Sequence, residues 1–117
     1  MNADPKISLS IIIPVYNSEN TITELVDLLI SELNEEYSLE IVLVNDCSKD
    51  NSEKVCIALY HKYRGLVKFY SLAKNVGEHN AVMAGLNKVN GDFIVIIDDD
   101  FQNPVSEVKK LVCYAKD

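Results

Sequence analysis

Four apolar runs alternate with amphipathic stretches along this chain of 117 residues. The runs Ile7–Pro14 and Leu39–Asn45 are rich in β-branched residues and predict strands that are buried on both faces. Two further runs, Leu66–Leu72 and Asp92–Ile97, predict a third and a fourth strand. Each run is followed by a stretch whose apolar residues recur at helical spacing, so the chain alternates between strand and helix.

The amphipathic stretches predict four helices, and several carry signals at their ends. Thr21 and Glu24 have the spacing of a capping box at the start of the first helix. Gly65 suits the C-terminal cap of the second helix. The helices are expected at Thr21 to about Asn34, Asn51–Tyr63, Glu78–Val89 and from Asn103-Pro104 onward.

This β-α-β-α-β-α-β-α order predicts right-handed crossovers, and therefore a parallel sheet with helices on both faces. We expect a Rossmann-like α/β fold whose four strands follow the order 3-2-1-4. Sheets of this kind bind ligands at the carboxyl ends of their strands, near the point where the strand order reverses. The polar residues that directly follow the strands are therefore the candidates for a functional site.

The composition narrows the choice of partners. With 11 basic and 18 acidic side chains, the net charge is −7. This charge argues against nucleic acid as a partner, because nucleic-acid affinity rests on Lys and Arg meeting phosphates. The apolar runs are far shorter than the ~20 residues of a membrane span. Three cysteines without metal or redox spacing favour reduced thiols, and we expect a cytoplasmic protein.

The sharpest chemical signal is an acidic cluster directly after the fourth predicted strand. In an extended chain Asp98 and Asp100 lie on the same side, while Asp99 points away. Gln102 adds an amide oxygen on that side, and such oxygen ligands suit Mg²⁺ or Mn²⁺. The alternative is a solvated acidic turn in which Asp100 or Asn103 caps the next helix.

The loops after the other strands carry candidates for nucleotide recognition. The Asp46 carboxylate fits the imide N–H of uracil, or the N1–H and amino group of guanine. Alternatively, it forms an Asx-turn or caps the helix near Asn51. Tyr16 offers a ring that can lie beside a base, or is a plain surface aromatic. Asn75 and Gly77 form a turn whose backbone N–H groups could meet a phosphate or ribose.

Together, four ordered segments make the chain resemble the nucleotide-binding half of a family-2 inverting glycosyltransferase with the GT-A fold. The segments are SIIIPVYN (Ser10–Asn17), LVNDCSKDNS (Leu43–Ser52), NVGEHNAVMAG (Asn75–Gly85) and IDDDFQNP (Ile97–Pro104). The last two are most similar to the polyprenyl-phosphate branch, whose members transfer a sugar from a nucleotide donor to undecaprenyl or dolichyl phosphate. The similarity runs from about residue 7 to residue 112.

The resemblance implies a role for individual residues. Asp46 matches the acid that recognises the nucleobase. Asp98 and Asp100 match the D-x-D motif that binds the metal and the diphosphate, and they are the expected catalytic residues. Gln102 matches the glutamine that assists the metal. The implied nucleotide-binding residues are Pro14, Val15, Tyr16, Asn17, Asp46, Asn75, Gly77, Asp98 and Asp99.

The chain departs from the family pattern in sequence and in length. Asn45 stands where the family usually has an Asp, and Ser18 where the polyprenyl-phosphate branch usually has Glu. Asp99 replaces a small residue, and Val105 replaces a Pro. The resembling enzymes continue well past the D-x-D motif. We therefore expect residues 1–117 to be the nucleotide-sugar-binding part of a longer glycosyltransferase domain, without its acceptor half.

The function implied by the resemblance is inverting transfer of a sugar from a nucleoside diphosphate, with UDP favoured and GDP left open. The acceptor is a polyprenyl phosphate or a glycan in bacterial cell-envelope synthesis, and a divalent Mg²⁺ or Mn²⁺ assists. Two alternatives remain: a nucleotide-binding module without turnover, and a sugar-phosphate nucleotidyltransferase. The latter would usually carry a Gly-rich loop where this chain has Pro14-Val15-Tyr16-Asn17.

Three expectations concern the isolated chain and its parent. The chain alone is expected to transfer no sugar, because nothing in it positions an acceptor. The unpaired edge at residues 92–97 is expected to promote self-association. The parent protein is expected at the cytoplasmic face of the membrane.

Overall fold

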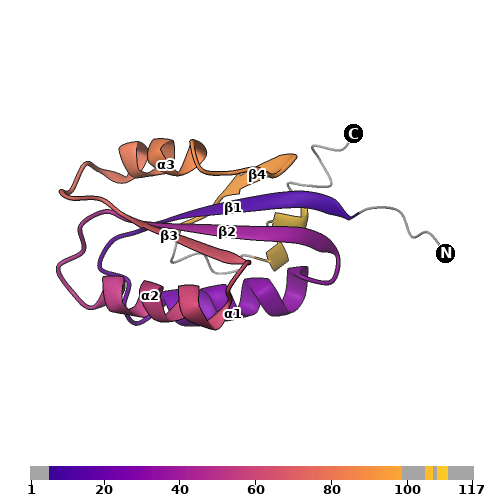
Figure 1. Ribbon diagram of the computed structural model, residues 1–117, viewed down its shortest axis with the longest axis horizontal. Coiled ribbons are helices and arrows are strands. Elements are labelled where there is room, and N and C mark those ends of the chain that lie inside the picture. Colours follow the sequence, from indigo (N-terminus) through magenta and orange to yellow (C-terminus); the bar gives the residue numbers. More distant parts are fainter. Residues whose placement is uncertain (1–5, 99–104, 107, 111–117) are drawn as a thin grey trace.

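The computed structural model describes residues 6–98, 105–106 and 108–110. Within this part of the chain, strands and helices alternate as predicted (Figure 1). Residues 105–106 and 108–110 are helical, where the fourth helix is predicted. The elements are β1 (Ile7–Val15), α1 (Ile22–Leu33), β2 (Tyr37–Asn45), α2 (Ser52–Lys62), β3 (Val67–Ser71), α3 (Glu78–Leu86) and β4 (Phe93–Ile96).

The four described strands form one parallel sheet in the order β3-β2-β1-β4, which confirms the predicted topology. β1 lies in the interior of the sheet, where Ile11 pairs with Ile41 of β2 and with Val95 of β4. The order reverses at β1, because the chain first adds strands on one side and then places β4 on the other. Because the four described strands are all parallel, their carboxyl ends lie at one edge of the sheet.

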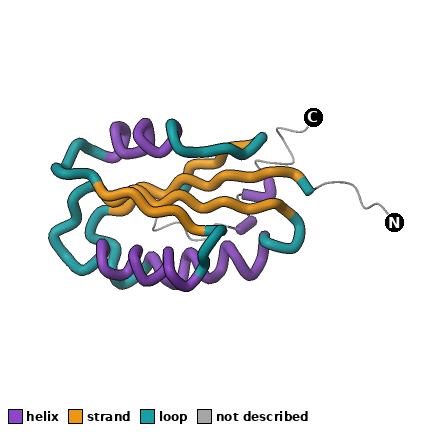
Figure 2. Tube along the Cα trace, viewed as in Figure 1, coloured by secondary structure: helices purple, strands orange, loops and turns teal. Residues whose placement is uncertain are grey.

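The helices form two unequal layers, with α1 and α2 on one face of the sheet and α3 on the other (Figures 1 and 2). The layer of α1 and α2 covers the larger core, because the predicted apolar stripe of α1 is fully directed at the sheet. Every member of that stripe is buried: Ile22, Leu25, Val26, Leu29 and Leu33.

The layer of α3 covers a much smaller core. Ile12, Val42 and Val44 form it together with Ala81 of the helix. Gly85 brings α3 close to the sheet, since a Cβ atom there would lie 2.9 Å from Cγ2 of Ile12. Small residues on α3 therefore replace the interlocking side chains that hold α1.

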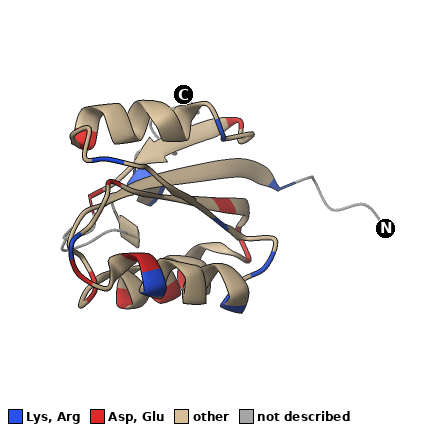
Figure 3. Ribbon diagram, turned by 60° about the vertical axis from the view of Figure 1, so that its left-hand side comes forward, with Lys and Arg blue, Asp and Glu red and all other residues tan. Residues whose placement is uncertain are grey.

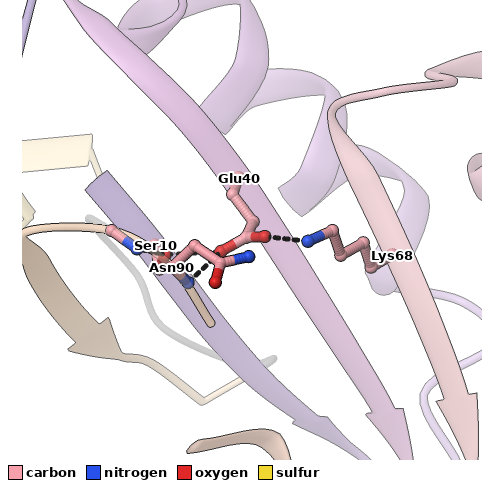
Figure 4. A network of polar contacts seen from close by, with 5 residues as sticks. Ser10, Glu40, Lys68 and Asn90 are labelled. Atoms are coloured by element: carbon pink, nitrogen blue, oxygen red, sulfur yellow. Dashed lines mark hydrogen bonds and ion pairs between the residues drawn. The ribbon is translucent and has the colours of Figure 1, made fainter. Parts of the chain in front are cut away.

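Beyond the end of α3, a polar network covers the same face of the sheet (Figure 4). Glu40 of β2 accepts hydrogen bonds from the Ser10 hydroxyl at 2.6 Å and from the backbone N–H of Asn90 at 3.0 Å. It also pairs with Lys68 of β3. The N–H of Gly91 donates to the Ser10 hydroxyl at 2.9 Å. The network thus ties the loop before β4 to three strands.

Two predicted helix ends differ in the structure. The capping box at Thr21 is wrong: Thr21 makes no side-chain cap, and its hydroxyl instead donates to the carbonyl of Ser18. The helix predicted to reach Val89 ends at Leu86. The chain leaves the helix early because the N–H of Asn90 must reach Glu40.

The surface carries both signs of charge on both sides of the sheet (Figure 3). Within the described residues, β3 and β4 form the two edges, and Ile94 and Ile96 of β4 are exposed. Self-association through this edge stays a prediction. None of the helices described here is long and apolar enough to cross a membrane.

Candidate functional site

An open pocket of about 420 Å³ lies at the carboxyl edge of the sheet, between the loop after β1 and the turn before α3. It brings together six of the nine residues predicted to bind a nucleotide, and it adds Glu78, which sequence reasoning missed. Its position directly after the Asn75–Gly77 turn was the available signal. The described lining residues are Pro14, Val15, Tyr16, Asp46, Asn75, Gly77 and Glu78.

The first wall of the pocket is the end of β1 and the loop behind it. Pro14 and Val15 are buried, and the Tyr16 side chain is 43% exposed. Asn17 follows with a φ of 53°, in the left-handed region that a non-glycine residue rarely adopts. This backbone turn ends the strand and leaves the Tyr16 ring at the mouth of the pocket.

Asn17 braces this loop against the loop after β2. Its N–H donates to the Ser48 hydroxyl at 3.0 Å, and its Oδ1 accepts the N–H of Lys49 at 2.8 Å. Asn17 does not belong to the described lining of the pocket. Its side-chain oxygen therefore has a bracing role here, and the predicted nucleotide contact stays a prediction.

Two further contacts join the same two loops, and a third supports one of them. The N–H of Ser18 donates to the Ser52 hydroxyl at 2.7 Å, and the N–H of Glu19 donates to Asp50 at 3.2 Å. Asp50 also accepts the N–H of Ser52 at 2.9 Å. Burial works to raise the pKa of Asp50, but these hydrogen bonds outweigh it, and the pKa lies below its ordinary value. The wall that carries Tyr16 is therefore firmly held.

The floor of the pocket is Asp46, a carboxylate that is only 3% exposed. Its oxygens accept the backbone N–H groups of Val76 at 2.8 Å and Gly77 at 3.0 Å. Neither the Asx-turn nor the cap near Asn51 describes these contacts. The N–H of Gly77 donates to Asp46 and Asn75, and its predicted contact with a phosphate or ribose stays a prediction.

Asp46 nevertheless keeps the capacity to bind a ligand. A carboxylate offers about four lone-pair sites, and the Asn75–Gly77 turn takes two of them. Gly77 adopts a φ of 91°, a conformation that suits glycine, so the turn can follow the carboxylate closely. Asp46 therefore positions the second wall of the pocket and can still accept a hydrogen bond from a base.

The contacts of Asn45 explain why an amide can stand where the family usually has an Asp. Its Oδ1 accepts the N–H and hydroxyl of Ser48, at 3.2 Å and 2.5 Å, while its Nδ2 donates to the Ser71 hydroxyl at 3.2 Å. An aspartate could accept the first two bonds but could not donate the third. The amide thus joins the end of β3 to the loop after β2, beneath the pocket.

Asp98 lies at the same edge, on the other side of β1. The Ile97 N–H donates to the carbonyl of Ile12 at 3.1 Å, so the chain follows β1 up to this point. Asp98 comes next and is exposed. The other predicted metal-site residues, Asp100 and Gln102, lie outside the described residues, as does Asp99, which is predicted to bind the nucleotide. The described part holds no three-residue metal cluster of its own.

Comparisons with known proteins show the family of this chain. The sequence profile described as glycosyl transferase family 2 matches residues 10–117. The undecaprenyl-phosphate 4-deoxy-4-formamido-L-arabinose transferase of Yersinia pestis (strain Pestoides F) is 38% identical over 117 residues, which covers 97% of this chain and 35% of that protein. The chain thus spans about a third of the length of the curated relatives that it matches.

Two solved structures share the fold. TarS of S. aureus in complex with UDP-GlcNAc is 28% identical with a TM-score of 0.68, covering 92% of this chain and 32% of TarS. GalNAc-T7 with UDP, GalNAc and Mn²⁺ is 26% identical with a TM-score of 0.69, covering 80% of this chain and 18% of the other. With its parallel 3-2-1-4 sheet, its edge pocket and the match over residues 10–117, the chain belongs to glycosyl transferase family 2.

Proposed function

We propose that this chain is the donor-binding part of an inverting glycosyltransferase that transfers a sugar from a nucleoside diphosphate to a polyprenyl phosphate in the bacterial cell envelope. The observation that carries the proposal is the pocket in which Tyr16, Asp46 and the Asn75–Gly77 turn converge, one strand away from Asp98. The similarity to an undecaprenyl-phosphate transferase supports the choice of acceptor.

The pocket suits the base end of the donor. Tyr16 presents an exposed ring against which a base can stack, and Asp46 presents a buried acceptor for an imide N–H. No described lining residue is basic, so the pocket has nothing to neutralise a diphosphate. The diphosphate therefore points out of the pocket, across the end of β1 and toward Asp98. The UDP complexes of the two structural relatives support a uridine nucleotide.

A divalent metal fits the diphosphate end of the donor, beside Asp98. Asp98 offers exposed carboxylate oxygens at the end of β4, which are ligands suited to Mg²⁺ or Mn²⁺. In our proposal Asp98 and Asp100 hold the metal with help from Gln102. When bound, the metal supplies Lewis-acid stabilisation of the departing nucleoside diphosphate. The Mn²⁺ in the GalNAc-T7 complex supports this assignment.

The acceptor chemistry follows from charge. A polyprenyl phosphate carries an anionic oxygen, so it attacks the anomeric carbon with little help from a general base. Attack opposite the leaving diphosphate inverts the configuration at that carbon. A lipid-linked acceptor puts the reaction at a membrane surface, and we assign the whole protein to its cytoplasmic face.

Calorimetry with UDP and GDP tests donor binding by the chain. We expect binding in Mn²⁺ that is lost in chelator, and we expect Asp98→Asn to weaken metal-supported binding by about tenfold or more. Asp92→Asn is the matched control, because Asp92 is exposed at the opposite end of the same strand. Equal affinity in chelator would contradict the metal role, and absence of binding by both nucleotides would contradict the proposal.

A transfer assay tests the acceptor. Transfer of labelled sugar from UDP-sugars to undecaprenyl phosphate is measured for the whole protein that carries this chain, with the 117-residue chain beside it. We expect transfer by the whole protein only. A protein that binds the donor but transfers to neither a lipid phosphate nor a glycan is a binding module.

A further inference from the structure

Positive charge is concentrated in one stretch of this acidic chain. Residues 54–77 contain five of the 11 basic side chains and no Asp or Glu. The stretch therefore carries a charge of +5, and the rest of the chain, with 6 basic and 18 acidic side chains, carries −12. The five basic residues are Lys54, Lys62, Arg64, Lys68 and Lys74.

This stretch forms one flank of the molecule, made by α2 and by β3, an edge strand of the described sheet. An open groove of about 530 Å³ lies between the two elements, and none of its described lining residues is acidic. Glu53 adjoins the stretch and accepts a hydrogen bond from the Ser71 hydroxyl at the end of β3. The residues that line the groove are Ile57, Tyr60 and His61 of α2 and Lys68, Phe69 and Tyr70 of β3.

The two sides of α2 differ in charge. On the side toward α1, Lys62 pairs with Asp27 at 3.1 Å, and the Tyr63 hydroxyl donates to the same carboxylate. On the side toward β3, Lys54 precedes His61 by seven residues, which is close to two helical turns, so both project beside the groove. The acids of α1 thus neutralise the first side of α2 and leave the second side positive.

Three of the basic residues keep their charge available. Lys62 and Lys68 are paired with acids of α1 and β2. Lys54, Arg64 and Lys74 are exposed and make no ion pair with any described residue. Arg64 precedes β3 and Lys74 follows it, directly before the turn that lines the donor pocket. Available positive charge therefore extends along the whole edge strand, up to the carboxyl edge of the sheet.

Apolar side chains are exposed between these cations. Ile57 is 39% exposed and Tyr60 is 43% exposed, and both border the groove. Basic side chains around exposed aromatic and aliphatic ones suit the headgroup region of an anionic bilayer, where Tyr rings settle and Lys and Arg meet lipid phosphates. A second copy paired along β3 fits less well, because it would bring the same cations against each other.

We propose that the flank formed by α2 and β3 is a docking surface for an anionic lipid bilayer. Lys54, Arg64 and Lys74 lie near the lipid phosphates, and Ile57 and Tyr60 lie at the level of the headgroups. This inference rests on the proposed function, which brings the reaction to a membrane surface, and it names the face that meets the lipid. A chain of net charge −7 needs such a face, since an anionic surface repels the rest of it.

The experiment measures binding of the 117-residue chain to vesicles of phosphatidylcholine, with and without phosphatidylglycerol, by co-sedimentation. We expect binding only to vesicles with phosphatidylglycerol, and weaker binding as salt is added. Replacing Lys54 and Arg64 together by Gln should lower the affinity about tenfold or more. Lys6 and Lys110, replaced together by Gln, are the matched control: both are exposed outside the flank, so this variant loses the same charge and should bind like wild type.

A fluorescent reporter tests the place of Tyr60. The chain contains no tryptophan, so Tyr60→Trp introduces a single indole. Its emission should shift to shorter wavelength on vesicles with phosphatidylglycerol, because the ring leaves water. Leu28→Trp is the matched control, since Leu28 is 40% exposed on α1 beside Asp27 and should show no shift.

The outcomes separate this surface from the donor site. Absence of binding to vesicles with phosphatidylglycerol would overturn the proposal and favour a protein partner for the flank. Equal losses in the two double variants, or unshifted emission from bound Tyr60→Trp, would overturn it as well. Thermal unfolding checks that each variant is folded. Calorimetry with UDP keeps the two proposals apart: UDP binding without vesicle binding overturns the lipid surface alone, and vesicle binding without nucleotide binding overturns the donor site alone.

Discussion

The two faces of the sheet are held by different means. The face under α1 and α2 is an apolar core whose largest side chains, such as Ile13 and Leu29, are fully buried. The face under α3 has a small apolar patch around Ile12, close packing at Gly85, and the polar network centred on Glu40. One face is stabilised by area removed from water, and the other by fit and hydrogen bonds.

This difference teaches how the pocket is built. The wall that carries Tyr16 is braced to the loop after β2 on the heavily packed side. The wall that carries Glu78 belongs to α3, on the lightly packed side. Damage to the first layer should therefore unfold the chain, whereas damage to the second should distort the pocket in a chain that remains folded.

The largest effect is expected from Leu29→Ala in α1. Leu29 is fully buried, and removing its side chain leaves a cavity that costs about 2–5 kcal/mol of unfolding free energy. Urea denaturation measures this loss. Met83→Ala in α3 is the counterpart, because Met83 is 50% exposed and should change stability by about 0.5 kcal/mol or less. Similar losses in both variants would break the comparison between the faces.

A second variant, Gly85→Ala, tests the close packing of α3. The added Cβ would meet Cγ2 of Ile12 at 2.9 Å and Cγ2 of Val44 at 3.1 Å, so the helix must shift. Overpacking costs about 1–3 kcal/mol, against about 1 kcal/mol gained from alanine's helix propensity. We expect a small net loss of stability together with weaker UDP binding in calorimetry. Tighter UDP binding would show that α3 does not position the pocket.

Asp46→Asn tests the two roles of Asp46, which holds the Asn75–Gly77 turn and forms the floor of the pocket. The amide keeps one acceptor and turns an NH₂ group toward the N–H groups of Val76 and Gly77, so one of the two bonds is lost. Losing a part-buried hydrogen bond to a charged acceptor costs about 1–3 kcal/mol. Faster hydrogen exchange at Val76 and Gly77 should accompany weaker UDP binding, while pyrophosphate binding in Mn²⁺ stays unchanged. A parallel fall in both affinities would assign Asp46 a purely structural role.

The alternation of strands and helices, and the order of the sheet, were predictable from the sequence. In a chain of this composition, an apolar run as long as Ile7–Pro14 indicates a buried strand. The bounds of all four strands lie within two residues of those predicted. The ends of the helices were not predictable in the same way. Thr21 satisfies a local pattern for a capping box, but its hydroxyl bonds back to Ser18, and Asn90 is drawn away from α3 by Glu40.

The candidate site was also predictable from the sequence only in part. The residues after each strand could be assigned to one pocket, because parallel strands end at one edge. The partners of Asp46 could not be assigned, since the turn at Val76 and Gly77 lies 30 and 31 residues away in sequence. Glu78 was missed because a helix-starting acid is common, and only the fold shows that this one lines a pocket.

The smallest effect concerns the acid stability of the α3 face. Burial opposes the charge on Glu40, but hydrogen bonds from Lys68, Ser10 and Asn90 outweigh it and hold the pKa of Glu40 below its ordinary value of 4.5. A lowered pKa means that the ionised carboxylate stabilises the folded chain above pH 4.5. This contribution is lost as the pH falls from 4.5 through the folded-state pKa.

Glu40→Gln should therefore be less stable than wild type at pH 7 and should lose less stability below pH 4.5, since the amide does not titrate. Urea denaturation at a series of pH values measures both slopes, and the exposed acid Glu32, replaced by Gln, serves as the control. The effect is modest because the Lys68 side chain is 39% exposed and solvent screens the pair. Parallel pH profiles for wild type and Glu40→Gln would mean that fit at Gly85 and Ala81, rather than this network, holds the α3 face in place.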